Sequence, residues 1–421
     1  MTALTTQTDV PPGPAGGPLP HRERLPLLLM AVIAVLTAAP VISGKLQALG
    51  VACVLLLPFV PRAVLRDRLV QLLCLTLALW GAGQLVSDEW NGLGPRLSRH
   101  FISAMAMLCI VPVLVFLARG DFRRMRAVIA GVAAGLVLET LLVEHASITS
   151  TISWKFGLNS PVAIFVLALT DLAWHRGRRL PSVVALVFIC LVGVATDHRH
   201  LAGVALLTAI VLLVRNRQRH PRTISVLAGL TLLLAALSGA FIQGSEAGVL
   251  GERSGGQIAK FGGTPQSIFV NVRPEPFQEF YLFTQRPTLG WGSLPRVDSA
   301  AYLGSKEFLR QLGVVRQDLD DIWLHLDVPG VSSHSQAMDS LARGGLSAAP
   351  FWLLLLGLAM LVGTQAIRFR SSPLVVLWTI LVLWDAICSP LSGLSHIELG
   401  AYMALAVTSL RHAPPTVPRV D

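Results

Sequence analysis

"FISAMAMLCIVPVLVFLARGDFRRMR", residues Phe101–Arg126, joins an uncharged apolar run to a cluster of arginines. A helix needs about 20 such residues to cross the hydrocarbon core of a bilayer. Arginines next to an apolar run are typical of loops on the cytoplasmic side of a membrane. The stretch therefore predicts a membrane-spanning helix that ends in the cytoplasm.

The composition of the whole chain agrees with this pattern. Of 421 residues, 53% are hydrophobic and 14% are charged, whereas soluble domains carry about 25% charged residues. The net charge of +10 does not indicate a nucleic-acid partner, because the arginines lie in short clusters between apolar runs. We expect an all-α polytopic membrane protein that contacts membrane lipids and binds no nucleic acid.

Twelve apolar runs predict about twelve transmembrane helices. They are residues 25–43, 46–60, 69–87, 101–118, 127–143, 161–174, 181–195, 201–214, 224–242, 346–363, 374–389 and 395–411. Several runs are shorter than a span requires, so they must borrow flanking residues. We therefore expect spans 1–9 in 25–242 and spans 10–12 in 346–411.

The basic residues predict the orientation of these spans. With the N-terminus in the cytoplasm, every inner segment carries arginines, whereas the short outer loops hold only a few basic residues. We expect a disordered N-terminal segment (1–24) and a C-terminal tail (412–421), both cytoplasmic. The long segment 243–345 is then extracytoplasmic, and its aromatic residues predict short helices lying over the bundle.

The cysteines predict no extra covalent or metal chemistry. All five lie within apolar runs, and no pair has the spacing of metal ligands. We expect neither a disulfide nor a zinc site.

The stretch "SSHSQ", residues 332–336, ends the long outer segment. Ser333 and Gln336 have the spacing of a capping box, which would make His334 the first helical residue. Gly344 or Gly345 would then end that helix. A helix N-terminus favours a neutral imidazole that can accept a proton, and it also suits an anion. Taken alone, the stretch is equally compatible with an interfacial histidine that has no role.

Several motifs together resemble the lipopolysaccharide O-antigen ligase family. The family's histidine signature is matched by His334, Ser335 and, after nine residues, Gly345, while Ala348 departs from it. "QRPTLGWGSL" (285–294) is similar to a family turn with proline and Gly-x-Gly. "ATDHRHLAGVALL" (195–207) and "WKFGLNSPVAIF" (154–165) are similar to family segments that carry a basic residue beside a span.

This resemblance implies a fold like that of GT-C glycosyltransferases in the bacterial inner membrane, with the active site on the periplasmic face. The implied donor is O-antigen on undecaprenyl pyrophosphate, and the implied acceptor is a sugar hydroxyl of lipid A–core. His334 would act as the base. Guanidinium groups bind phosphate well, so the candidate pyrophosphate ligands are Arg199, Arg273, Arg286 and, more weakly, Lys155. The resemblance implies neither a metal nor a cofactor.

Two carboxylates within predicted spans are also notable, because buried acids in lipid are costly. We interpret Glu139 as structural. Asp385 lies near the outer end of its span, where it would support the site by pairing with an arginine or with His334. Ser335 and Gly345 are the other two residues that we expect to support the site. A purely structural pairing of Asp385 is equally compatible with the sequence.

Three alternatives remain open at this stage. An O-antigen polymerase and a protein O-oligosaccharyltransferase share these motifs and the same fold. A transporter or lipid flippase would instead require broken helices and paired charges at the middle of the membrane.

Overall fold

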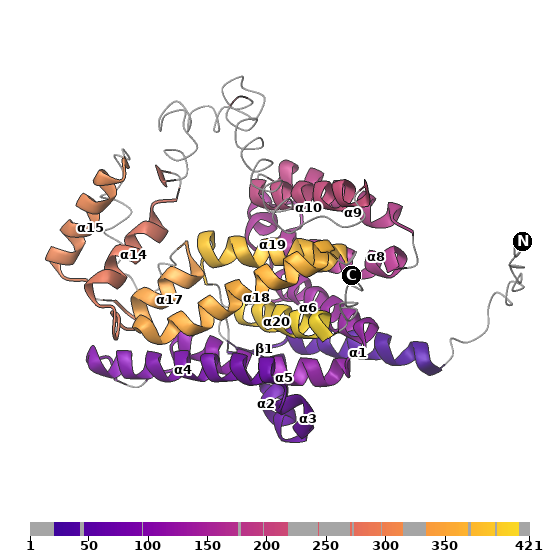
Figure 1. Cartoon of the computed structure of the whole chain (residues 1–421), viewed down its shortest axis with the longest axis horizontal. Helices are drawn as coiled ribbons and strands as arrows, with labels where there is room; N and C mark the ends of the chain where they lie inside the picture. Colours follow the sequence, from indigo (N-terminus) through magenta and orange to yellow (C-terminus); the bar gives the residue numbers. More distant parts are fainter. Residues whose placement is uncertain are drawn as a thin grey trace, which may run out of the picture.

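The computed structural model describes residues 21–42, 46–94, 96–175, 178–196, 198–217, 243, 270–271, 273–295, 297–314, 334–368, 372–391 and 394–411. Most of these residues are helical, and the helices form an elongated bundle (Figure 1). The predicted span 224–242 lies outside the described residues.

The described helices follow one another with short connections. They are α1 (His21–Ala38), α2 (Ala48–Leu56), α3 (Arg62–Leu65), α4 (Arg68–Trp90), α5 (Arg99–Ala118), α6 (Phe122–Leu142), α7 (Thr151–Ser153), α8 (Asn159–His175), α9 (Leu180–Ala195), α10 (Arg199–Arg217), α14 (Glu275–Gln285), α15 (Ser299–Gln311), α17 (Gln336–Gly344), α18 (Ala349–Arg368), α19 (Pro373–Cys388) and α20 (Ser395–Arg411). A π-helical turn, Trp154–Leu158, precedes α8, and 3₁₀ turns follow α2 (Leu57–Phe59) and α17 (Gly345–Ala348).

Each predicted run other than 224–242 falls on a helix. Four described helical stretches are long and apolar enough to cross a membrane, namely α4, α5, α6 and the continuous stretch Gln336–Ala366, and six more apolar helices are shorter. The chain thus has the helices of an all-α membrane protein, and the number twelve stays a prediction.

The end of the first predicted run and the start of the second form a feature that the sequence did not predict. Strand β1 (Pro40–Ile42) pairs antiparallel with β2 (Leu46–Gln47), and the following helix α2 has only 9 residues. At 1.5 Å per residue α2 is about 14 Å long, which is half of the hydrocarbon thickness.

Helices α5 and α20 form the centre of the bundle. Met107, Ile110 and Leu114 of α5 are fully buried, and so are Tyr402 and Met403 of α20. α5 also packs against α2, α4 and α6. Apolar side chains on every face of these two helices explain their central place, because a helix that is hydrophobic all round is buried.

The two ends of the bundle differ in charge. At one end, Arg126 at the start of α6 binds Asp171 near the end of α8 at 3.0 Å. At the same end, Arg411 of α20 binds Asp67, the N-cap of α4, at 2.7 Å. We call this the basic end, because the arginines of the turns before α4 and before α6 lie there. The opposite end, where α4 ends and α5 begins, is the site end.

Candidate functional site

Helix α17 begins later than the sequence pattern predicts. Ser335, not Ser333, is its N-cap, and the Ser335 hydroxyl accepts the backbone N–H of Met338 at 3.2 Å. The same hydroxyl donates to the Ala386 carbonyl of α19 at 3.0 Å, which fixes the cap against the bundle. The predicted capping box was therefore wrong, because the serine with a partner on α19 is the one that caps. Ser333 lies outside the described residues, and the predicted end at Gly344 or Gly345 is confirmed.

His334 consequently stands just before the cap instead of within the helix. Its side chain is 38% exposed, and its Nδ1 lies 3.5 Å from Oε1 of Glu275, the first residue of α14. Arg273 precedes that helix by two residues and is partly buried. Its charge acts on Cys388, the last residue of α19. The starts of α14 and α17 thus meet the end of α19 at the site end.

Asp385 lies within this same region, on the last turn of α19. It accepts a hydrogen bond from the Ser389 hydroxyl at 2.6 Å, and it interacts electrostatically with Glu398 of α20. Its neighbour Trp384 stacks on the ring of His200, with centroids 5.8 Å apart and planes 4° apart. Among the described residues, the hydrogen-bond partner of the Asp385 carboxylate is therefore a serine rather than an arginine or His334.

The start of α10 is joined to this region through Trp384. His198 is buried, with its Nδ1 2.7 Å from the Asn159 amide of α8 and its Nε2 3.0 Å from Nε2 of His200. Arg199 lies between these two histidines as the first residue of α10. Lys155 lies in the π-helical turn before Asn159. The backbone thus brings Arg199 and Lys155 to the site end, and their side chains lie outside the described atoms.

Arg286 has a different environment, at the far end of α14. It donates to Asn91 Oδ1 at 3.0 Å, lies 3.9 Å from the ring centroid of Trp291, and is 3.9 Å from Asp298. The 11 residues of α14 separate it from His334 by about 16 Å of helix. Of these two candidate arginines, Arg273 precedes the end of α14 that contacts His334, and Arg286 follows the opposite end.

The turn that contains Gly290 and Gly292 packs against the glycines at the end of α17, Gly344 and Gly345. The turn 286–292 donates backbone hydrogen bonds from Trp291 to Ala342 (2.9 Å) and from Gly292 to Arg343 (3.0 Å), and Leu346 donates to Pro287 (2.7 Å). Gly345 has φ 65°, and a Cβ there would lie 2.3 Å from the Thr288 carbonyl oxygen. Gly345 therefore lets the end of α17 pack closely against the turn 286–292.

We expect Gly345→Ala to destabilise the protein by about 1–3 kcal/mol, because it combines a left-handed φ with a backbone clash. The thermal unfolding midpoint in detergent measures this loss. Gly357→Ala on α18 is the control, because a Cβ at that helical position meets nothing within 4 Å and Ala favours the helix. An unchanged midpoint for Gly345→Ala would show that the two motifs are not in close contact.

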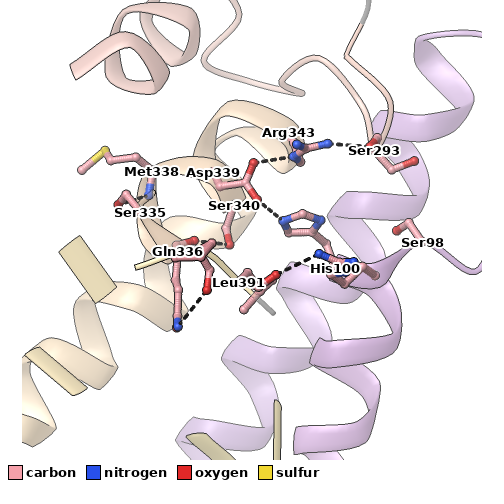
Figure 2. Close-up of polar contacts among 12 residues, drawn as sticks. Ser98, His100, Ser293, Ser335, Gln336, Met338, Asp339, Ser340, Arg343 and Leu391 are labelled. Carbon is pink, nitrogen blue, oxygen red and sulfur yellow. Dashed lines mark hydrogen bonds and ion pairs between the residues drawn. The ribbon is translucent and has the colours of Figure 1, made fainter. Parts of the chain in front are cut away.

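A buried charged network, which the sequence analysis missed, supports α17 from its other side. Asp339 forms ion pairs with Arg343 and, at 2.9 Å, with Nε2 of His100 on α5 (Figure 2). Arg343 also donates to the Ser293 carbonyl at 2.6 Å. Asp88 of α4 accepts the backbone N–H of Ser293 at 2.6 Å. We call His100, Asp339, Arg343, Ser293 and Asp88 the support network.

Glu279 of α14 lies beside this network. Its complete burial and the negative charge of Asp339 raise the pKa of Glu279 well above its ordinary value, although Arg343 opposes the shift. This shift moves Glu279 toward its neutral form, which lessens the negative charge around Arg343.

The spacing of Asp339 and Arg343 is the one sequence signal for this network, since residues four apart on a helix face each other. Nothing in the sequence links them to His100, which lies 239 positions away. Among the described residues, no group of three or more His, Cys, Asp or Glu side chains is arranged to hold a metal ion.

Comparisons with protein-family models, curated proteins and solved structures found no match to this chain.

Proposed function

We propose that this protein is an O-antigen ligase of the inner membrane. It would transfer the glycan from undecaprenyl pyrophosphate to a sugar hydroxyl of lipid A–core at the periplasmic face. The observation that supports this proposal best is that His334, Arg273 and the start of α10 all lie around the end of α19 at the site end. One proton acceptor and several cations close together are what the reaction needs.

The charge difference between the two ends supports a periplasmic position for this site. The arginine-rich turns lie at the basic end, and basic loops remain in the cytoplasm. His334 lies at the opposite end of the same helices. A lipid-linked donor and a lipid-anchored acceptor would both present their reacting groups at that membrane surface.

The proposed step follows from these groups. The acceptor oxygen attacks the anomeric carbon of the donor while its proton passes to the imidazole of His334. The bond from the anomeric carbon to the pyrophosphate oxygen breaks, and the electron pair stays on the leaving pyrophosphate. Arg273 and Arg199 stabilise the negative charge that this oxygen gains. His334 then releases the proton to water.

Arg273→Ala is expected to weaken donor binding about 10- to 100-fold, which corresponds to one or two charged hydrogen bonds. Arg273→Lys should restore it only in part, because an ammonium does not form the paired contacts of a guanidinium. Arg286→Ala is the matched control, since the Arg286 side chain is held by Asn91 and Trp291. The measurement is the dissociation constant of undecaprenyl-pyrophosphate-linked glycan. Weaker binding by the Arg286 variant alone would reverse the assignment.

Two reconstituted reactions distinguish the ligase from the related enzymes. In the first, liposomes contain the purified protein, the lipid-linked glycan and lipid A–core; in the second, lipid A–core is omitted. Capped lipid A–core in the first reaction and no product in the second support a ligase. Longer lipid-linked chains in the second reaction would identify a polymerase. Movement of the donor between leaflets without any new glycosidic bond would identify a flippase.

A further inference from the structure

The carboxylate of Glu275 lies at ion-pair distance from one particular nitrogen of His334, and this contact is not a hydrogen bond in the structure. Oε1 of Glu275 lies 3.5 Å from Nδ1, and the Glu275 side chain is 17% exposed. The other oxygen, Oε2, is buried and accepts no hydrogen bond from the described residues. Among the described residues, His334 is thus the one basic side chain within 4 Å of the Glu275 carboxylate.

The backbone holds both residues in place for this contact. Glu275 occupies the first turn of α14 after Pro274, where the helix dipole favours a negative side chain. His334 precedes the cap of α17, and that cap is tied to Ala386 of α19. α14 and α17 pack directly against each other. The contact therefore joins the starts of two packed helices and does not depend on a free loop.

A carboxylate beside one ring nitrogen decides where a neutral imidazole carries its proton. A carboxylate oxygen only accepts hydrogen bonds, so the facing nitrogen must be the donor. The lone pair is then on the other nitrogen. Distances between such groups are often long without substrate and shorten when substrate binds.

We propose that Glu275 is a positioning residue that keeps the His334 proton on Nδ1 and so makes Nε2 the atom that accepts the proton of the acceptor hydroxyl. The inference rests on the proposed function. After the transfer of that proton, Glu275 also stabilises the imidazolium, which carries a proton on each nitrogen. No oxidant, metal or further reactant is required for this role.

Glu275→Gln tests the role in the full-length protein in liposomes. We expect kcat to fall about 10- to 100-fold, as for other residues that orient a functional histidine, with little change in KM for donor and acceptor. Glu275→Asp should retain more activity than Glu275→Gln, because it keeps the charge. Glu307→Gln on the exposed face of α15 is the matched control and should leave kcat unchanged. A wild-type kcat for Glu275→Gln would overturn the proposal.

A spectrum tests the same contact without any activity measurement. Nitrogen chemical shifts of ¹⁵N-labelled histidine distinguish the two tautomers, and the signals of His334 are assigned by their loss in His334→Gln. The wild-type protein should show protonated Nδ1, and Glu275→Ala should lose this preference. The same tautomer in both proteins would overturn the inference. If His334→Gln transfers glycan at the wild-type rate, the proposed function fails, and the spectrum still decides whether Glu275 controls the imidazole.

Discussion

His334→Gln should lower the rate of glycan transfer about 100- to 10,000-fold, which is the usual contribution of a general base. The glutamine side chain has a similar length and polarity but accepts no proton at neutral pH. The substitution precedes the cap of α17, so the Ser335 hydroxyl still binds Met338 and Ala386. We therefore expect the variant to fold and to reach the membrane in normal amounts. The readout is the initial rate of lipid A–core capping in liposomes.

His145→Asn is the matched control for this experiment. His145 is exposed in the turn after α6, at the same end of the bundle. It has φ 52°, a conformation that asparagine tolerates better than most residues. Wild-type activity in this variant would show that the lower transfer rate of His334→Gln is specific to His334 and does not follow from replacing any histidine at this end. If His334→Gln capped lipid A–core as fast as the wild type, His334 would not be the base.

Asp339→Asn should lower the free energy of unfolding by about 3–5 kcal/mol, the usual cost of removing one partner of a buried ion pair. Asp339 is buried, and its carboxylate contacts both Arg343 and His100. Without its charge, the guanidinium of Arg343 stays buried with less compensation. The thermal unfolding midpoint in detergent measures the loss.

Two controls separate the ion pair from a general effect of the substitution. Asp298→Asn removes an exposed carboxylate that is 3.9 Å from Arg286, and it should cost less than about 1 kcal/mol. Replacing both partners, as Asp339→Leu with Arg343→Met, should be less damaging than Asp339→Asn alone, because no guanidinium is then left without its carboxylate. An Asp339→Asn variant as stable as the wild type would contradict the support network.

The helices were predictable from sequence wherever a run of apolar residues was long enough to indicate a buried or membrane-spanning helix. The runs around α5 and α20 are buried on every side, so their hydrophobicity alone predicted them. The pairing of β1 with β2 was not predictable, because it joins the end of one apolar run to the start of the next. The glycines at 344 and 345 predicted the end of α17 correctly, since a left-handed residue was needed there.

The candidate site was predictable in its residue types and only partly in its geometry. Spacing favoured Ser333 as the cap, whereas the contact of Ser335 with Ala386 depends on a helix far along the chain. Sequence proximity left Arg273 and Arg286 open, and the length and direction of α14 separate them. The contacts of His334 with Glu275 and of Asp339 with His100 join distant segments. Without an alignment of related chains, no local pattern carries such information.

The most direct test of the account is a stoichiometric one. Purified protein is placed in liposomes with lipid-linked O-antigen and lipid A–core, and both the capped lipid A–core and the free undecaprenyl pyrophosphate are quantified over time. A ligase with its site at His334 and Arg273 should release one undecaprenyl pyrophosphate for each glycan attached, and His334→Gln should suppress both products together. Absence of capped lipid A–core with the wild-type protein, or release of pyrophosphate without glycan transfer, would contradict the account.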